Sequence, residues 1–399
     1  MKKILFLFLI LLSSCTITSN VVIEPFSEVN VYFCPQDDCQ NKILHLIDDS
    51  SEIKCAFYEL NLPELIESLK QKNAEVIIED SQYEGEFQTG KSFALMHNKF
   101  CVFDNHIVMT GSMNPTIRGN YYNNNNLLFI DSVALANNFL KEFEELKNNQ
   151  YGKGNRIQNS KIQLGNTKIE NYFCPEDNCK LQVINALNTA NNSIYFMVFS
   201  FTDEDIGNLL YNKEYLGLDV KGVLEKRQLG TYSRYEDLKE FSIIDENPYT
   251  MHHKVFIIDN KTIITGSYNP TKNANENNDE NILIIHDKNI AKKYLEEFEK
   301  LYYNNFEEKS NIKITKVVYD VPGSDKGKEY VEIQNTGIVL ENLNYYFISN
   351  NKTSSKLNGT ININETKRIF PKFSLTNKQG VVQLKKHIYV VDSFSWDNS

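Results

Sequence analysis

The chain has 399 residues, of which 41% are hydrophobic and 24% charged, and its formal net charge is -10. This length exceeds what one compact core usually organises, so two or three folded units are expected. The negative charge excludes a broad basic surface, and any nucleic-acid site must therefore be a local basic cleft on an acidic body.

The N-terminus has the features of a targeting segment. Two lysines precede the apolar run 4–12, which is too short to span a bilayer, and a Leu-Ser-Ser-Cys sequence then ends at Cys15. This sequence resembles a bacterial lipobox, in which Cys15 becomes the lipidated first residue; an ordinary signal peptide that ends near a cysteine is the alternative. We therefore expect a lipoprotein signal over 1–15 and a tether over 16–28, with the exported protein anchored to a membrane of the cell envelope.

Two short cysteine pairs share the sequence Cys-Pro-x-Asp-x-Cys. They are Cys34 with Cys39 and Cys174 with Cys179. In an exported protein these pairs predict two local disulfides, and one zinc site built from all four thiolates is the less favoured alternative. Two further cysteines, at positions 55 and 101, lie in apolar runs and are expected to be buried, with a disulfide between them as the alternative.

Two segments of the chain show the same order of strands and helices. In the first, strands are expected over 29–33, 53–60 and 76–78, and helices over 40–48 and 63–72. In the second, strands are expected over 193–201 and 220–224, and helices over 180–189 and 203–211. Because strands alternate with helices, each segment is predicted to form an α/β unit with a mixed sheet flanked by helices. The first half is assigned to residues 29–150 and the second half to residues 151–310.

One motif occurs in each half with identical spacing, His-x-Lys-x4-Asp-x6-Gly-Ser-x-Asn. Its residues are His97, Lys99, Asp104, Ser112 and Asn114 in the first half, and His252, Lys254, Asp259, Ser267 and Asn269 in the second. The histidine and the lysine are two residues apart, so they share one face of a strand. The Asp-Asn dipeptides at 104–105 and 259–260 predict hairpin turns that pair Phe103 with His106 and gather imidazole, ammonium, hydroxyl and amide groups at one mouth. Asp104 and Asp259 lie at the turn end of this hairpin, so a structural role is expected for them.

The two halves align as an internal repeat. Met96 pairs with Met251 and Leu146 pairs with Leu301, which is a constant offset of 155 residues. The duplication predicts a pseudo-two-fold arrangement with the two hairpins facing each other, and both half-sites lie in one chain, so a monomer is sufficient. His253 is expected to point away from the site, and no spacing links the remaining histidines to it, which are His45, His106, His286 and His387.

The last segment, 311–399, has a different pattern. Short β-like runs alternate with turn signals such as Asn358-Gly359, and this pattern predicts a small immunoglobulin-like β-sandwich. The sequence over 328–335, together with 375–377 and 391–392, resembles the lamin-tail domain. No catalytic cluster is found in this sequence, so an accessory module that binds an unknown partner or acts as a spacer is expected.

The paired motifs resemble the signature of the phospholipase D superfamily, and the resemblance extends over residues 29–305. The second half is similar to small bacterial nucleases of this superfamily through the stretches 251–254 and 264–269. The resemblance implies that one histidine attacks phosphorus and forms a phosphohistidine, while the other protonates the leaving oxygen and then activates water. It also implies that Lys99, Lys254, Asn114 and Asn269 hold the non-bridging oxygens, and that Ser112 and Ser267 add hydroxyl hydrogen bonds.

The two halves differ after the Gly-Ser-x-Asn sequence, where the superfamily often has a glutamate that binds the motif histidine. The second half has Glu280, and the aligned residue of the first half is Asn125. A carboxylate beside His252 would favour its protonated form, as an acid requires, and an amide beside His97 would leave that ring neutral. We therefore expect His97 to be the nucleophile and His252 to be the acid.

The expected function is that of a phosphodiesterase that needs no metal and no other cofactor, because lysines supply the positive charge. Nucleic acid is the favoured substrate, since the second half is nuclease-like. A phospholipase D that hydrolyses membrane phospholipids is the alternative, and a catalytically idle envelope-binding protein is a third interpretation, suggested only by Asn125. A basic groove between the halves would favour the nuclease, and an apolar rim would favour the phospholipase. The Lys226-Arg227 pair resembles a Lys-Arg-Gln stretch of related nucleases and either contributes substrate charge or is a solvated loop pair.

Overall fold

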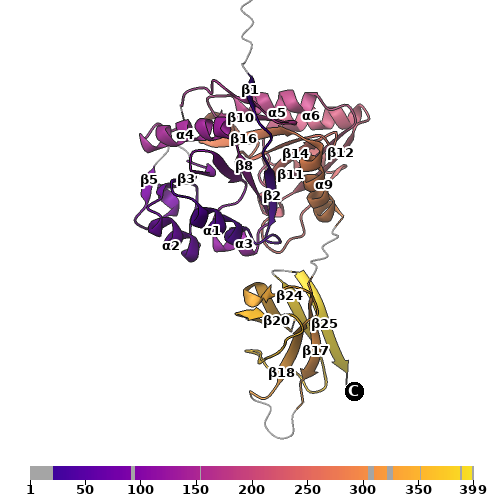
Figure 1. The fold of residues 1–399 in the computed structure, drawn as a ribbon. Helices are drawn as coiled ribbons and strands as arrows, with labels where there is room; N and C mark the ends of the chain where they lie inside the picture. Colours follow the sequence, from indigo (N-terminus) through magenta and orange to yellow (C-terminus); the bar gives the residue numbers. More distant parts are fainter. Residues whose placement is uncertain are drawn as a thin grey trace, which may run out of the picture.

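The computed structural model describes residues 21–90, 95–152, 154–303, 310–320, 327–350, 352–386 and 389–397. Within these ranges two α/β halves form one body, and an all-β domain follows them (Figure 1). The predicted architecture, with two mixed sheets flanked by helices and a C-terminal all-β unit, is confirmed. The signal segment with Cys15, the start of the tether and His387 lie outside the described residues.

The first half is built on a seven-stranded sheet with the order β2-β8-β7-β6-β3-β4-β5. All five residues of the motif strand β6 are buried, as its continuous apolar run predicts for a central strand. The strands are β2 (Val29–Cys34), β3 (Ile53–Phe57), β4 (Glu75–Glu79), β5 (Gln88–Gly90), β6 (Lys99–Phe103), β7 (Ile107–Gly111) and β8 (Asn125–Asp131). The helices are α1 (Cys39–Asp49), α2 (Pro63–Gln71), α3 (Ile117–Tyr121) and α4 (Val133–Lys147), with a 3-10 turn at Asp80–Gln82.

The second half repeats this plan in a nine-stranded sheet with the order β1-β9-β10-β16-β15-β14-β11-β12-β13. The strands are β1 (Val21–Glu24), β9 (Lys161–Leu164), β10 (Thr167–Cys174), β11 (Ser193–Val198), β12 (Asp219–Leu224), β13 (Ser242–Ile244), β14 (Lys254–Ile258), β15 (Thr262–Gly266) and β16 (Glu280–His286). The helices are α5 (Cys179–Asn188), α6 (Glu204–Tyr215), α7 (Tyr235–Leu238), α8 (Lys272–Glu276) and α9 (Lys288–Tyr302), with a 3-10 turn at Lys226–Gln228.

Strand β1 corrects the predicted tether over 16–28. Residues 21–24 pair in parallel with β9, so they belong to the sheet of the second half. Without β1, strand β9 would be at the edge of the sheet with unpaired backbone groups, and the short β-branched segment of β1 pairs with these groups.

The body has five layers, in which each sheet lies between an outer and an inner pair of helices (Figure 1). The outer pairs, α1 with α2 and α5 with α6, cover the outer cores of the two halves. The inner pair, α4 and α9, shares a single core with the facing sides of both sheets, where Phe139 and Phe298 are fully buried. This shared core holds the two halves in a fixed relation, as a composite site requires.

The predicted hairpin turns form, but their register differs from the prediction by one residue. Asp104 and Asn105 have φ values of 46° and 60°, as a tight turn requires. Phe103 pairs with Ile107 rather than with His106, because the loop contains three residues. His106 is therefore in the loop rather than in a strand, and its Nδ1 lies 2.8 Å from Asp131 Oδ1, within hydrogen-bond distance. The second hairpin shows the same shift, with Ile258 paired to Thr262.

Three disulfides cross-link the body. Cys34 binds Cys39, and Cys174 binds Cys179, which confirms the predicted local pairs and leaves no free thiolates there for the alternative zinc site. Cys55 binds Cys101 directly across β3 and β6, with their Cα atoms 4.0 Å apart. This last bond ties the motif strand of the first half to its neighbour, 46 residues away in sequence.

The C-terminal domain is a small β-sandwich that contacts the body at α3, where Lys356 Nζ lies 5.4 Å from the ring centroid of Tyr121. Its strands are β17 (Ile312–Val318), β18 (Tyr330–Asn335), β19 (Glu341–Asn342), β20 (Tyr346–Ser349), β21 (Ser354–Lys356), β22 (Thr360–Ile361), β23 (Thr366–Ile369), β24 (Gln379–Lys386) and β25 (Tyr389–Asp397), with a 3-10 turn at Leu343–Tyr345. Across the described parts of the chain, no helix is both long enough and apolar enough to cross a membrane.

Candidate active site

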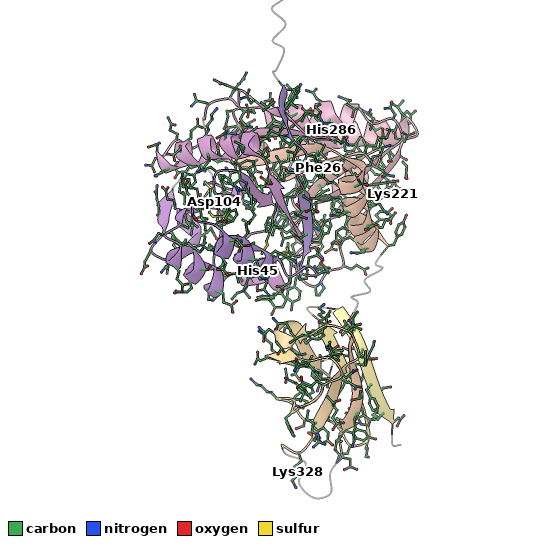
Figure 2. All side chains as sticks on the ribbon, viewed as in Figure 1. Phe26, His45, Asp104, Lys221, His286 and Lys328 are labelled. Carbon is green, nitrogen blue, oxygen red and sulfur yellow. A yellow bond between two sulfur atoms is a disulfide. The ribbon has the colours of Figure 1, made fainter. Side chains whose placement is uncertain are left out.

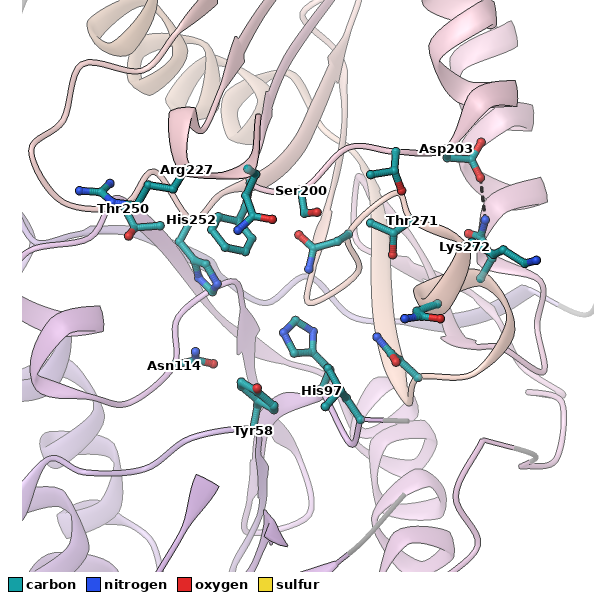
Figure 3. Close-up of a pocket in the computed structure, with 18 of the residues that line it drawn as sticks. Tyr58, His97, Asn114, Ser200, Asp203, Arg227, Thr250, His252, Thr271 and Lys272 are labelled. Carbon is teal, nitrogen blue, oxygen red and sulfur yellow. Dashed lines mark hydrogen bonds between the residues drawn. The ribbon is translucent and has the colours of Figure 1, made fainter. Parts of the chain in front are cut away.

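The two motif histidines lie just before the motif strands, at the junction between the halves. The backbone N–H of His97 donates to the carbonyl of Asp279 in the second half, at 2.9 Å. In the same way, the N–H of His252 donates to the carbonyl of Asn124 in the first half, at 2.8 Å. Each half therefore fixes the backbone of the other half's histidine, and the predicted pseudo-two-fold arrangement brings His97 and His252 face to face across one pocket (Figure 3).

Each histidine is also held by a side chain from the opposite half, which corrects the predicted pairing. Glu280 Oε2 lies 2.8 Å from Nδ1 of His97, not beside His252. Asn125 Oδ1 lies 2.9 Å from Nδ1 of His252. The prediction was wrong because it assumed partners within one aligned repeat, whereas β8 and β16 start at the junction and extend these side chains across it. With Nδ1 engaged in both rings, Nε2 is the atom that each ring presents to the pocket.

The motif lysines lie beneath the histidines and are 2% and 3% exposed. Lys99 Nζ donates to the carbonyl of His97 at 2.6 Å, and Lys254 Nζ donates to that of His252 at 2.8 Å. An aromatic ring covers each ammonium group. Tyr58 lies 5.1 Å from Lys99 Nζ, and Phe199 lies 4.9 Å from Lys254 Nζ, measured to the ring centroids. These two rings also pack edge-on against the histidines, so they keep water from the inner side of the site.

In this cluster the effect of burial on the pKa values of the lysines outweighs the attraction of Glu280. Burial lowers the pKa of both histidines well below the usual value, and the two lysines lower it further. Burial also lowers the pKa of Lys99 to about 7, and burial with the charge of Lys99 lowers that of Lys254. Burial raises the pKa of Glu280 to about 7, against the opposing effect of Lys99. An anion placed between the histidines would favour the charged lysines, which is the arrangement expected of a phosphate-binding site.

The motif serines and asparagines separate into two groups. Ser112 and Ser267 are fully buried behind the histidines, and their hydroxyls accept from the N–H groups of Asn126 and Asn281. Neither serine lines the pocket, so the expected contact of these hydroxyls with substrate stays a prediction. Ser112 Oγ instead donates to Asn125 Oδ1 at 3.2 Å, the atom that holds His252. By contrast, Asn114 and Asn269 line the pocket, where their amides can reach a bound phosphate.

Asp104 and Asp259 lie at the hairpin turns, at the opposite ends of the motif strands from the histidines (Asp104 is labelled in Figure 2). Asp104 Oδ1 accepts from the backbone N–H groups of Ser51 and Glu52, both at 2.8 Å. Asp259 accepts from three successive N–H groups before β11. These bonds organise the entrance to the neighbouring strand, so the two aspartates support the fold of the motif strand. His45 is exposed and His286 is half-buried beside Glu170, and neither lines the histidine pocket.

Several positioning residues were missed from the sequence. Glu79, at the end of β4, accepts from the N–H of Met96 at 2.7 Å, and Glu225, after β12, accepts from that of Met251 at 2.7 Å. A glutamate stands at the end of β4 and directly after β12, which are corresponding strands of the two halves. This repeated position could have identified both glutamates from the sequence. Glu59 also lines the pocket, where it accepts from Asn114 Nδ2 at 3.1 Å; its counterpart after β11 is Ser200, so no repeated pattern marked it.

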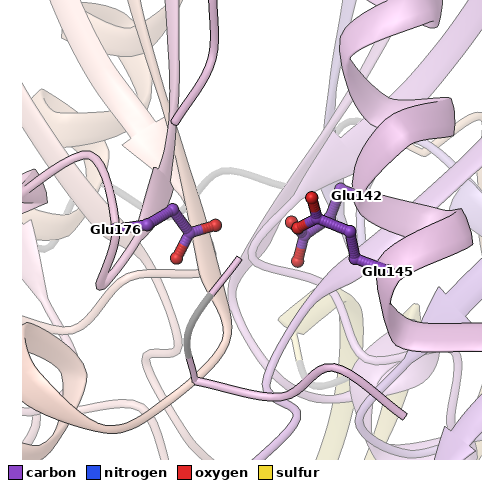
Figure 4. A group of neighbouring side chains, drawn as sticks. All are labelled: Glu142, Glu145 and Glu176. Atoms are coloured by element: carbon purple, nitrogen blue, oxygen red, sulfur yellow. The ribbon is translucent and has the colours of Figure 1, made fainter. Parts of the chain in front are cut away.

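A buried polar network lies behind the site, between the two sheets. His253 points away from the site, as expected, because it is fully buried and its Nδ1 lies 3.1 Å from Asn126 Nδ2 in this network. On the other side of the pseudo-two-fold axis, three glutamates from both halves gather, and these are Glu142, Glu145 and Glu176 (Figure 4). Burial raises the pKa of Glu142 well above its usual value and raises that of Glu176 to about 7. None of these residues lines the histidine pocket.

The histidines open into a pocket of about 1110 Å³, and most of the residues that line it have polar side chains. Asparagine is the most frequent residue in the wall, and the contributing positions are Asn61, Asn114, Asn123, Asn125, Asn269, Asn273, Asn275 and Asn278. Arg227 also lines it, whereas its neighbour Lys226 is not among the lining residues. The pocket therefore has neither the uniformly basic wall nor the apolar rim that the sequence left as alternatives.

Comparisons with known proteins agree with this geometry. A family model described as "Cardiolipin synthase, PLD-like domain" matches residues 40–147 and 183–302, which is more than half of the chain. The phospholipase D of Rickettsia conorii is 34% identical over 138 residues, which are 34% of this chain and 69% of that protein. The human mitochondrial cardiolipin hydrolase is 31% identical over 134 residues, which are 30% of this chain and 50% of that protein. The solved phosphatidylserine synthase of Haemophilus influenzae shares the fold, with a TM-score of 0.54 at 12% identity over 69% of this chain and 89% of that one. The chain therefore belongs to the phospholipase D superfamily, and it carries both halves of a phosphodiesterase site in one polypeptide.

Proposed function

We propose that this protein is a metal-independent nuclease that acts through a phosphohistidine intermediate. His97 Nε2 attacks phosphorus while the bond to the leaving oxygen breaks, and His252 gives its Nε2 proton to that oxygen. In the second step His252 removes a proton from water, the resulting hydroxide attacks phosphorus, and the P–N bond breaks. Lys99 and Lys254 stabilise the charge on the non-bridging oxygens, so the chemistry does not depend on a metal ion.

The assignment of the nucleophile rests on Glu280, with a reasoning that differs from the sequence-based one. Phosphorylation at Nε2 leaves the His97 ring positively charged, because Nδ1 keeps its proton. A carboxylate 2.8 Å from that Nδ1 stabilises the charged intermediate. The amide of Asn125 offers His252 no such charge, so the His252 imidazolium stays the stronger acid and the better proton donor.

The substrate preference rests on the polarity of the pocket wall. Acyl chains would require a continuous apolar rim, whereas most of the residues that line this pocket carry an amide, a hydroxyl or a charged group. Tyr232 lines the same pocket with 83% of its surface exposed, and an exposed ring beside a phosphodiester site is suited to stacking on a nucleic-acid base.

A phospholipase D is the second candidate function. It is favoured by the names of the similar proteins, a phospholipase D at 34% identity and a cardiolipin hydrolase at 31% identity. A nuclease and a phospholipase D would use the same histidine pair and the same mechanism. Only the substrate that is hydrolysed distinguishes the two functions.

The decisive experiment compares substrates with residues 16–399 of the protein, in the presence of EDTA. Plasmid DNA, RNA, single-stranded oligonucleotides and phosphatidylcholine vesicles are incubated side by side. Hydrolysis of a nucleic acid that survives EDTA and is lost in His97→Ala and in His252→Ala supports the proposal. Cleavage of the vesicles alone assigns the phospholipase function. Activity that disappears with EDTA and returns with a divalent ion contradicts the mechanism.

A further inference from the structure

The pocket around the histidine pair differs in charge between its two ends. In Figure 3, Arg227 and Thr250 lie on one side of His97 and His252, and Asp203 and Lys272 lie on the other. The scissile phosphate binds between these ends, so the remaining parts of a substrate must extend towards one end, the other, or both.

One end is formed by α3 and the turn after β12, and its two arginines, Arg118 and Arg227, balance the carboxylates of Glu59 and Glu225, so this end has no net negative charge. Arg118 on α3 is exposed and lines the pocket. The chain continues to Tyr122, whose ring lies 4.5 Å from that of Tyr249. Arg227 Nη2 donates to the carbonyl of Pro248 at 2.5 Å, so the two arginines lie at the same end. Arg227 is partly neutralised by Glu225 at 3.1 Å, which leaves Arg118 as the more available cation.

The other end is acidic and belongs to α6 and α8. Four of its carboxylates line the pocket, against two lysines, and these residues are Asp203, Glu204, Asp205, Glu276, Lys180 and Lys272. Lys180 binds Asp205 at 2.6 Å and lies 3.9 Å from Asp203, so its charge is already used. The hydrogen bond to Asp205 is the main cause that raises the pKa of Lys180, and the nearby charge of Glu276 raises that pKa further. A phosphate placed at this end would face a net negative charge.

This asymmetry matters for a polyanion. A strand that is cut internally has phosphates on both sides of the scissile one, and one side would have to pass the acidic end. A strand cut at its last phosphodiester has only an uncharged nucleoside on that side. A single-stranded conformation also lets the last base leave the stack without unpairing.

We propose that the polarised pocket makes this protein act at strand ends, with the phosphate-bearing strand along Arg118 and an unphosphorylated terminal nucleoside at the Asp205–Glu276 end. The inference rests on the proposed nuclease function and names its substrate class, single-stranded nucleic acid with a free terminal hydroxyl. Arg118 is then a substrate-binding residue, and Asp205 and Glu276 are specificity-determining residues.

The test uses the full exported chain and four substrates. These are linear single-stranded oligonucleotides with hydroxyl termini, the same oligonucleotides phosphorylated at the 5′ or at the 3′ end, covalently closed single-stranded circles, and bis(p-nitrophenyl) phosphate. We expect the circles and one of the two phosphorylated forms to be cleaved at least about tenfold more slowly than the hydroxyl form, because like charges meet at the acidic end. Asp205→Asn with Glu276→Gln should remove this discrimination, whereas Glu296→Gln with Glu299→Gln, an equal charge change on the exposed face of α9, should not.

Arg118→Ala should raise KM for oligonucleotides and flatten the salt dependence of that KM. The rise in KM should be larger for oligonucleotides than for bis(p-nitrophenyl) phosphate, which has no flanking phosphate. Circles cut as fast as linear strands, or equal cleavage of all terminal forms, would overturn the inference and leave the nuclease function standing. Cleavage of phosphatidylcholine vesicles with no cleavage of any oligonucleotide would instead overturn the proposed function itself.

Discussion

At the scale of single residues, the site depends on one carboxylate shared between the halves. Glu280 starts β16 in the second half and holds His97 of the first half, while Ser267, beside it, keeps the strand start in place. The first-half counterpart, Asn125, gives His252 a neutral partner in the same geometry. Two histidines of identical motif context thus receive different electrostatic environments.

The first prediction concerns this carboxylate. Glu280→Gln should lower kcat about 100-fold with little change in KM, because the amide still orients His97 but no longer stabilises the charged phosphohistidine. The measurement is single-turnover kinetics with rapid quench, followed by mass spectrometry of the trapped phosphoenzyme. Phosphate should be found on His97, and its recovery on His252 would reverse the two roles.

The second prediction concerns protons and anion binding. Burial lowers the pKa of Lys99 to about 7 in the free protein, and a bound anion must raise it. The folded protein therefore takes up a proton when an anion binds above pH 7, and affinity falls as pH rises from 7 towards the pKa of the complex. Sulfate is the probe, since its own charge is constant over this range. Competitive inhibition constants measured from pH 6 to pH 9 should rise about tenfold per unit above pH 7, and a flat profile would exclude the proton uptake.

At the scale of elements, corresponding strands and helices of the two halves meet at the junction, but the two sides of the junction differ in charge. On one side, Glu297 of α9 lies 3.4 Å from Lys300 and 3.7 Å from His253. On the other side, α4 and the turn after β10 bring Glu142, Glu145 and Glu176 together, and within the described ranges none of these three carboxylates forms an ion pair (Figure 4). The acidic side therefore makes stability depend on pH.

The third prediction follows from the raised pKa of Glu176. Its folded-state pKa is about 7, and an unfolded glutamate has a pKa of about 4.3, so the folded state binds more protons between these values. The contribution of Glu176 to the free energy of unfolding is fully present below pH 4 and is lost as the pH rises to 7. Glu176→Gln should be more stable than the parent at pH 8 by on the order of 1–3 kcal/mol, and equal to it at pH 4. Urea unfolding at both pH values measures this difference.

The control for this experiment is Glu144→Gln on the exposed face of α4, which removes the same charge outside the cluster. It should change stability by less than about 0.5 kcal/mol at either pH. Equal effects of the two substitutions would mean that net charge, rather than the buried cluster, governs the pH dependence.

At the scale of the whole molecule, the chain combines a body of two α/β halves with a C-terminal β-sandwich, and we propose that a lipid on Cys15 holds it at a membrane. We propose that the sandwich, which resembles a lamin-tail domain in sequence, binds a partner or spaces the enzyme from its anchor. The body itself needs no second copy, because one chain contains both histidines and both of their partners from opposite halves.

The fourth prediction concerns the proposed anchor. Cys15→Ala should move the exported protein from the membrane fraction to the soluble fraction, since a Leu-Ser-Ser-Cys sequence follows a short apolar run. Fractionation with detection of the C-terminal domain measures the shift. Ser13→Ala, a change within the same sequence that keeps the cysteine, is the control and should stay membrane-bound. A Cys15→Ala protein that remains with membranes would require another anchor.

The repeated spacing of the motif was sufficient to predict the family, the two α/β halves, the hairpins and the histidine, lysine and asparagine residues of the site. These features are local or periodic, so strand alternation, turn dipeptides and an internal offset of 155 residues encode them directly. The two Cys-Pro-x-Asp-x-Cys disulfides were predictable for the same reason, because five residues separate each pair.

Other features depended on how the halves pack. Glu280 and His97 are 183 residues apart, and the bond between them exists because parallel bridges at Met96 and Asn124 join the halves at the junction. The burial of Ser112 and Ser267, the rings of Tyr58 and Phe199 over the lysines, and the charge difference between the ends of the pocket arise in the same way. Sequence periodicity specifies on which face of a strand a side chain lies. Which residue of the other half it contacts there depends on how the shared core of α4 and α9 packs the two halves together, and this core exists only in the folded chain.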